Sequence, residues 1–252
     1  MRLPLNTSLD VFDNIDSLGE RFARELVARV VETTARQALF TLALSGGRTP
    51  EPLLRRLAEP EYREAAPWEL VKVFFTDERP VGPHHPDSNY GMAWEAWLRH
   101  GAVPRHRIFR MEGDDPDLRE AAARYGEIVL RQVPPGPSGF PALDLVVLGM
   151  GEDGHVASLF PGTEALEESL RIAAANQVPQ LQTERLTLTL PVINSAREIW
   201  MIVCGENKAR RVAQVLAASP FDEPLPAMMV RPAHGRMVWW LDRAAASGIN
   251  AG

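Results

Sequence analysis

The sequence predicts an α/β fold: a doubly wound, mostly parallel, Rossmann-like sheet with helices on both faces, formed as a single domain by residues 1–252. Short apolar runs alternate with stretches whose apolar residues recur at helical spacing, which indicates strand–helix–strand units. The chain is 45% hydrophobic and 24% charged, as expected for a globular protein with a substantial core. Several apolar runs end in glycine or polar residues, as strands do where such a sheet binds ligands.

The expected strands are short runs of apolar and β-branched residues. They lie at about 9–12, 39–44, 70–76, 107–110, 145–149, 185–191, 198–204 and 237–241. The run at 185–191 alternates polar and apolar residues, whereas the run at 198–204 is nearly all apolar and is expected to be buried.

The expected helices follow these runs. They cover about residues 17–37, 51–58, 89–100, 117–132 and 208–218. Before the second helix, Thr49 fits the N-cap and Pro50 the first helical position. The proline- and glycine-rich segment 133–141 is expected to be a loop.

Overall composition limits the class of protein. The formal net charge of −6 offers nothing that would attract nucleic acid or an anionic membrane, so any bound anion needs a local cluster of cations. No apolar run reaches the roughly 18 residues of a membrane span, and residues 1–7 lack a signal-peptide core, so a cytoplasmic protein is expected. The only cysteine, Cys204, lies in an apolar run and is expected to be a buried packing residue.

The residues after the strand at 39–44 can hold a phosphate. They are Ser45, Gly46, Gly47, Arg48 and Thr49. A turn from strand to helix supplies free backbone N–H groups and a positive helix end, and this one adds hydroxyls and a guanidinium. The alternative is an ordinary tight connection. The turn is not a nucleotide P-loop, because it lacks the glycine spacing and the Gly-Lys-Ser/Thr ending.

Three glycines lie at the end of the strand at 145–149 and directly after it, and their spacing matches the G-x-G-x-x-G dinucleotide fingerprint. They are Gly149, Gly151 and Gly154. We reject that interpretation because the chain reaches Pro161 and Gly162 too soon for a crossover helix, and no second strand ends in an acid about 20 residues on. The glycines are instead expected to bend the chain around a small ligand.

His155 directly follows this turn, beside Glu152 and Asp153. A neutral imidazole oriented by a carboxylate can take a proton from water, so His155 is the candidate general base. The alternative is a capping or core histidine without a catalytic role.

Two further polar clusters follow predicted strands, at Asp77–Arg79 and at Gly205–Lys208. Because the carboxyl ends of parallel strands share one edge, both are expected near the phosphate loop and His155. Asp77 and Arg79 could otherwise form a surface ion pair, and Arg185 and Lys208 could be solvated. His84, His85 and Asp87 are not matched by a second motif with ligand spacing, so no metal is expected.

Taken together, these motifs resemble the 6-phosphogluconolactonase family. The matching stretches are Leu-Ala-Leu-Ser-Gly-Gly-Arg-Thr-Pro, Phe-Phe-Thr-Asp-Glu-Arg, Asp-Ser-Asn-Tyr, Gly-Met-Gly-Glu-Asp-Gly-His-Val-Ala-Ser-Leu-Phe-Pro-Gly, Arg-Leu-Thr-Leu-Thr-Leu-Pro and Cys-Gly-Glu-Asn-Lys-Ala. The resemblance spans most of the chain. It implies hydrolysis of 6-phospho-D-glucono-1,5-lactone to 6-phosphogluconate, a phosphosugar lactone as the binding partner, no cofactor, and a monomer.

The resemblance also implies roles for individual residues. His155 would activate water, and Arg79 would stabilise charge near the reacting end. Asp77 or Asp153 would orient groups or bind sugar hydroxyls. The phosphate would be held by Ser45, Gly46, Gly47, Arg48, Thr49, Arg185 and Lys208, and Gly149, Gly151 and Gly154 would form the substrate-binding turn.

Two alternatives remain. The related glucosamine-6-phosphate deaminases and isomerases share the phosphate loop, but they have a tyrosine where this chain has Arg79. They also continue with Asn-Glu-Pro where this chain has Ser158-Leu-Phe-Pro161. A non-catalytic sugar-phosphate sensor would need an effector segment, for which we find neither spare length nor a basic patch.

Overall fold

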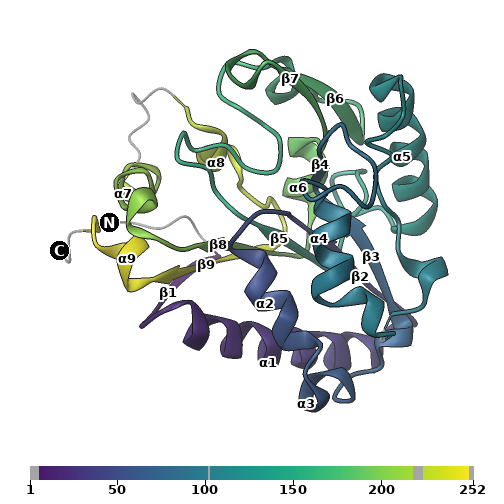
Figure 1. The fold of residues 1–252 in the computed structure, drawn as a ribbon, viewed down its shortest axis with the longest axis vertical. Coiled ribbons are helices and arrows are strands. Elements are labelled where there is room, and N and C mark those ends of the chain that lie inside the picture. The colour runs from purple at the N-terminus through teal and green to yellow at the C-terminus, as the bar shows by residue number, and fades with distance from the viewer. Residues whose placement is uncertain (1–5, 102, 218–223, 250–252) are drawn as a thin grey trace.

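The computed structural model describes residues 6–101, 103–217 and 224–249. Within these ranges the strands form a six-stranded parallel sheet in the order β1-β9-β8-β5-β2-β3 and a three-stranded antiparallel sheet in the order β4-β7-β6 (Figure 1). The strands of the larger sheet are β1 (Thr7–Phe12), β2 (Phe40–Leu44), β3 (Val71–Phe75), β5 (Leu145–Leu148), β8 (Glu198–Val203) and β9 (Arg236–Asp242). Those of the smaller sheet are β4 (Asp77–Glu78), β6 (Ala173–Val178) and β7 (Thr183–Leu188).

The helices lie between the strands, as the alternating pattern predicts. They are α1 (Ile15–Thr34), α2 (Pro50–Leu57), α3 (Pro60–Arg63), α4 (Asn89–Ala96), α5 (Leu118–Gln132), α6 (Leu190–Ser195), α7 (Ala209–Leu216), α8 (Pro226–Met229) and α9 (Arg243–Ala246). None of the helices in the described ranges is long and apolar enough to cross a membrane. Two predictions, the signal-free start at residues 1–7 and the helix end at Ala218, fall wholly or partly outside the described residues.

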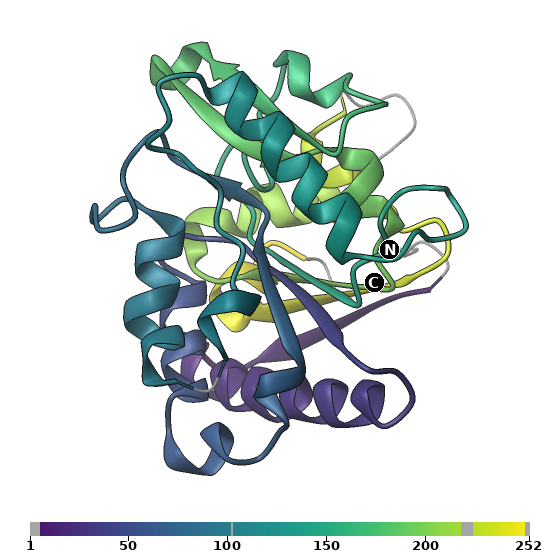
Figure 2. The ribbon, with the colours of Figure 1, turned by 90° about the vertical axis from the view of Figure 1, so that its right-hand side faces the viewer.

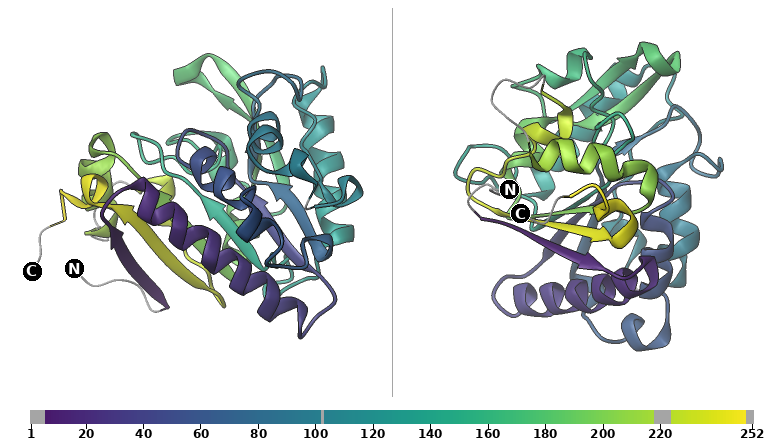
Figure 3. Two further views of the ribbon diagram at one scale, coloured as in Figure 1. Left: turned by 60° about the horizontal axis from the view of Figure 1, so that its bottom comes forward. Right: turned by 90° about the vertical axis from the view of Figure 1, so that its left-hand side faces the viewer.

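Two apolar cores form, one on each face of the parallel sheet. Successive strand residues point to opposite faces, so in β8 Trp200 and Ile202 join the core beneath α1, α2 and α4, whereas Ile199 and Met201 join the core beneath α5, α6 and α7. Figure 3 shows α1 lying along the sheet beside β1 and β9, and Figure 2 shows α5 (teal) beside the green strands of the smaller sheet. The doubly wound α/β fold is therefore confirmed.

The strand predicted at 107–110 is wrong. Residues Arg105–Arg107 form a turn of 3₁₀ helix, and Ile108 makes only an isolated parallel bridge with Val73. The run is short and is interrupted by charged arginines, so it lacks the length to extend the edge of the sheet beyond β3.

The structure differs from the sequence prediction in other places as well. The strand predicted at 185–191 exists as β7, but it pairs antiparallel with β6 in the smaller sheet. Strand β6 itself was not predicted, because a run with three alanines has little strand propensity and forms only by pairing with β7. The helix predicted at 89–100 is interrupted at Trp97, whose backbone leaves the helical region before a 3₁₀ turn over Leu98–His100.

Candidate active site

A cavity of about 730 Å³ opens at the carboxyl ends of the parallel strands β2, β5 and β8, as the strand-end rule predicts. The sequence-predicted residues that line it are Ser45, Gly46, Gly47, Arg48, Thr49, Asp77, Arg79, Gly149, Gly151, His155, Arg185 and Lys208. Two predicted members do not line it. Asp153 contacts His155, and Gly154 turns with a φ of 86° and packs against Leu225.

The loop after β2 needs glycine at Gly46 for a steric reason. A Cβ at Gly46 would lie 1.6 Å from Oδ1 of Asn89, a fully buried residue at the start of α4. Gly47 has a φ of 101°, a left-handed conformation that side chains disfavour. Helix α2 begins at Pro50 as predicted, but Thr49 at the N-cap makes no side-chain capping bond. The loop therefore presents backbone N–H groups and the positive end of α2 to the cavity.

Lys208 faces the cavity from the turn after β8. Burial lowers its pKa, the carboxylates of Glu152 and Asp153 oppose this, and the positive charge of Arg48 adds to the lowering. Nδ2 of Asn207 donates to Oε1 of Glu152 at 2.5 Å, which fixes that carboxylate. Lys208 and Arg48 therefore contribute positive charge next to the glycine loop, where an anion can be bound.

His155 is held by Asp153 through two contacts. Oδ1 of Asp153 lies 2.6 Å from Nδ1 of the ring and accepts the backbone N–H of His155 at 3.1 Å. The ring stacks on Phe160, with 4.1 Å between centroids. It also passes so close to Gly151 that a Cβ there would lie 2.1 Å from Nδ1. The imidazole therefore has one orientation, set by a carboxylate, an aromatic face and a glycine.

The electrostatics of Asp153 agree with this pairing. Burial raises its pKa, but the hydrogen bond and the charge of His155 outweigh that effect, so the pKa lies below its ordinary value. A carboxylate accepts the Nδ1 proton, which leaves Nε2 of a neutral imidazole as the unprotonated nitrogen.

Asp77 is buried and does not form the surface ion pair considered above. Its Oδ2 accepts from Oγ of Ser158 at 2.8 Å, and its Oδ1 accepts from Oγ1 of Thr76 at 3.0 Å. Nη1 of Arg79 donates instead to the backbone carbonyl of Asp87 at 2.6 Å. Both Asp77 and Arg79 line the cavity with fixed orientations.

Arg185 reaches the cavity from β7. Its Nη1 donates to Oγ1 of Thr183 at 2.8 Å. Burial lowers the pKa of Arg185, and the charge of Arg79 adds to this, while acidic neighbours including Asp77 oppose it. Arg79 and Arg185 thus add two more cations to the cavity, and these come from other segments than Lys208 and Arg48.

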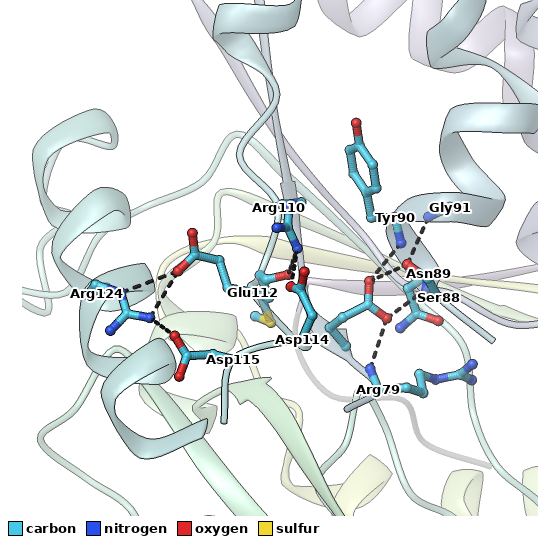
Figure 4. A network of polar contacts seen from close by, with 12 residues as sticks. Arg79, Ser88, Asn89, Tyr90, Gly91, Arg110, Glu112, Asp114, Asp115 and Arg124 are labelled. Atoms are coloured by element: carbon cyan, nitrogen blue, oxygen red, sulfur yellow. Dashed lines mark hydrogen bonds and ion pairs between the residues drawn. The ribbon is translucent and has the colours of Figure 1, made fainter. Parts of the chain in front are cut away.

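The backbone N–H of Arg79 is held by a buried carboxylate (Figure 4). The buried carboxylate of Glu78 accepts four hydrogen bonds, from the backbone N–H groups of Arg79, Asn89 and Tyr90 and from the Ser88 hydroxyl. Burial raises its pKa, and the backbone hydrogen bonds oppose that rise.

On the other side of Arg79, the close approach of its carbonyl requires glycine at Gly113, where a Cβ would lie 2.0 Å from the oxygen. The loop around Gly113 is fastened to α5 by Arg124, which pairs with Glu112 and Asp115 (Figure 4).

Sequence reasoning missed several residues of this site. Ser158 and Phe160 also line the cavity, and Asn89 supports it from behind. Asn207, which lines the cavity, and Glu78 lie in the two clusters that the strand-end rule places at this edge, but the sequence assigns no role to either of them. Cys204, predicted to be a packing residue, is only partly buried and lines the cavity. The pKa of its thiol is raised to about 12 by burial and by the charge of Asp242.

Within the described ranges, no group of three or more His, Cys, Asp or Glu side chains is placed to hold a metal ion. Nδ1 of His85 accepts the backbone N–H of Asp87 at 3.1 Å instead.

The fold and this edge define an α/β protein in which a glycine-containing loop, four cationic side chains and a histidine–carboxylate pair surround a cavity. The family model described as glucosamine-6-phosphate isomerases/6-phosphogluconolactonase matches residues 13–239. The chain belongs to this family.

Curated relatives and solved structures agree with this assignment. The chain is 36% identical over 246 residues to 6-phosphogluconolactonase of Nostoc sp., covering 98% of this chain and 100% of that protein. It is 38% identical over 242 residues to the Synechocystis sp. enzyme of the same name, covering 96% and 98%. The structure of 6-phosphogluconolactonase from Trypanosoma brucei superposes with a TM-score of 0.86 at 25% identity, over 97% of this chain and 99% of that one. A monomeric glucosamine-6-phosphate deaminase at 22% identity, with a TM-score of 0.79, shares the fold.

Proposed function

We propose that this protein hydrolyses 6-phospho-D-glucono-1,5-lactone to 6-phosphogluconate, with His155 as the general base. Relatives named 6-phosphogluconolactonase match nearly the whole chain and support the reaction. The observation that carries the role of His155 is the 2.6 Å contact from its Nδ1 to Asp153 at the wall of the cavity. This contact selects the tautomer in which Nε2 can accept a proton.

In the first half of the reaction, Nε2 of His155 takes a proton from water while the water oxygen attacks the lactone carbonyl carbon. The carbonyl π bond opens and its electrons move to the oxygen, which becomes an oxyanion. The positive charge of Arg79 stabilises this oxyanion, and the carboxylate of Asp153 stabilises the imidazolium. Asp77, held by Ser158 and Thr76, orients the sugar hydroxyls.

In the second half, the oxyanion reforms the carbonyl and the bond to the ring oxygen breaks. The imidazolium returns its proton to that leaving oxygen, and the new carboxylic acid ionises to the product carboxylate. The phosphate is held throughout by Lys208, Arg185 and the loop at 45–49, which lines the cavity directly before α2 and can offer backbone N–H groups to an anion. Gly149 leaves room for the sugar beside the strand end, and Gly151 leaves room for the ring of His155.

The reaction is tested by coupling turnover of freshly made lactone to 6-phosphogluconate dehydrogenase and subtracting spontaneous hydrolysis. His155→Ala is expected to lower kcat by about 10²- to 10⁴-fold, the range of general-base catalysis. His100→Ala, at an exposed position, is the control and should match the parent. Parent-like turnover by His155→Ala would remove the general-base role. Release of ammonia from glucosamine 6-phosphate without lactone hydrolysis would favour the deaminase alternative.

The phosphate site is tested with two lactones. Lys208→Ala should raise KM for the phosphorylated lactone far more than for unphosphorylated gluconolactone, because only the first carries the anion. Lys72→Ala is the matched control, since Lys72 is the other lysine of the chain and its Nζ donates to the carbonyl of Gln132 outside the cavity. Equal effects of Lys208→Ala on both lactones would remove Lys208 from the phosphate site.

A further inference from the structure

Thr76 lies behind the cavity, at the junction of the two sheets. Its backbone N–H donates to the carbonyl of Leu44 in β2 at 2.9 Å, and its carbonyl accepts from Leu188 in β7 at 2.7 Å. The side chain is fully buried and does not line the cavity. These two backbone hydrogen bonds join the sheets, and the hydroxyl of Thr76 is not needed for that connection.

The hydroxyl of Thr76 connects two residues that do line the cavity. Oγ of Ser45 lies 2.7 Å from Oγ1 of Thr76, and Oγ1 of Thr76 lies 3.0 Å from Oδ1 of Asp77. The second oxygen of Asp77 accepts from Ser158 at 2.8 Å. All four side chains are buried, with exposed fractions of 6% or less, so water does not compete strongly for these bonds.

The direction of the chain follows from counting hydrogens. Asp77, as a carboxylate, can only accept, and its Oδ1 lies 3.0 Å from Oγ1 of Thr76, nearer than the carbonyl of Leu44 at 3.5 Å. The single hydroxyl hydrogen of Thr76 is therefore directed to Asp77. Thr76 must then accept from Ser45, and the hydrogen of the Ser45 hydroxyl points inward. In this arrangement Ser45 does not donate to the phosphate. The N–H groups of the following loop residues and the cationic side chains remain to bind the anion.

We infer that Thr76 is a positioning residue, whose hydroxyl links Ser45 of the anion loop to the Asp77 carboxylate and fixes that carboxylate for the reaction. This role rests on the proposed function. Without the hydroxyl, Oδ1 of Asp77 loses a donor and Oγ of Ser45 loses its acceptor, so the carboxylate is free to rotate about its remaining bond to Ser158. Thr76 touches no substrate and acts only through its neighbours.

The test compares Thr76→Val, which removes the hydroxyl at similar volume, with Thr76→Ser, which keeps it. We expect Thr76→Val to lower kcat/KM by about 10- to 100-fold, the effect of a misplaced group, and by the same factor for phosphorylated and unphosphorylated lactone. Thr76→Ser should restore most of the activity. An unchanged kcat/KM for Thr76→Val, or a loss confined to the phosphorylated lactone, would overturn the role.

Thr41→Val is the matched control. Thr41 is also a buried threonine whose hydroxyl donates to a carboxylate, that of Asp144 at 2.7 Å, but it lies near the opposite end of β2. This variant should lose stability and keep the parent kcat/KM per folded molecule. A loss of kcat/KM as large as that of Thr76→Val would overturn the inference, because it would show that any buried hydroxyl–carboxylate pair has the effect.

Ser45→Ala tests the direction of the hydrogen bond between Ser45 and Thr76. It also keeps the inference testable if Thr76→Val does not fold. Its effect should be equal on the two lactones, and where Thr76→Val folds, the double variant with Thr76→Val should lose less than the product of the single losses. A loss confined to the phosphorylated lactone would make Ser45 a phosphate ligand and would overturn the hydrogen-bond chain from Ser45 through Thr76 to Asp77. Absence of lactonase activity in the parent would overturn the proposed function and this role with it, whereas an active parent with unaffected variants would overturn the role alone.

Discussion

Replacing Asp153 with Asn removes the negative charge beside His155 but can keep the hydrogen bonds. A single oxygen, Oδ1, accepts both from the ring Nδ1–H and from the backbone N–H, and the amide oxygen of Asn can occupy the same place. The tautomer of His155 is then retained. Asp153→Ala, by contrast, removes the acceptor altogether and leaves the ring free to rotate and to change tautomer.

The expected magnitudes follow from the exposure of the pair. Two unit charges about 4 Å apart interact by about 1 kcal/mol in water and by about 4 kcal/mol near a protein surface. The side chains of Asp153 and His155 are 42% and 30% exposed, so solvent screening favours the lower value. A loss of about 1 kcal/mol in transition-state stabilisation lowers kcat about fivefold. We therefore expect Asp153→Asn to lower kcat about fivefold. Asp153→Ala, which loses the orientation of the base, should lower kcat about 100-fold or more.

The assay is the coupled measurement of kcat with freshly made lactone, run for both variants beside His155→Ala. This expectation is refuted if Asp153→Asn is as slow as His155→Ala, since the charge alone would then carry the whole effect. It is equally refuted if the Asn and Ala variants have the same kcat, because the acceptor oxygen would then contribute nothing.

Three further predictions concern the surroundings of the cavity. Gly46→Ala should lower the free energy of unfolding by about 1–3 kcal/mol in urea titrations, because the new Cβ would lie 1.6 Å from Oδ1 of Asn89; parent-like stability would contradict the close approach. Glu78→Gln should lower the free energy of unfolding by about 2 kcal/mol or more, because an amide N–H₂ replaces an oxygen that accepts hydrogen bonds from buried donors. An unchanged free energy of unfolding would show that Glu78 does not anchor α4. Burial raises the pKa of Cys204 to about 12, so at about pH 8 almost no thiolate exists in the folded protein. Iodoacetamide should therefore label the folded protein far more slowly than the urea-unfolded chain, and equal labelling rates would refute this prediction.

Much of the parallel sheet could be predicted because its signals are local. Apolar runs and helical spacing lie within a few residues of one another, and β2, β3, β5, β8 and β9 appear close to their predicted positions. The failures lie where pairing decides the structure. Residues 107–110 have strand-like content but make only one bridge, and the alanine-rich β6 forms because β7 pairs with it.

For the site, the sequence by itself determined which segments carry the polar groups. Glycine turns, a histidine beside acids and a loop rich in small residues all follow strands, and parallel strands bring their carboxyl ends to one edge. The tertiary structure alone decided which atoms meet: Asp77 with Thr76 rather than Arg79, Asn89 against Gly46, and Cys204 at the cavity wall. A hydrogen bond depends on distances of a few tenths of an ångström between segments remote in the chain, and no local pattern encodes those distances.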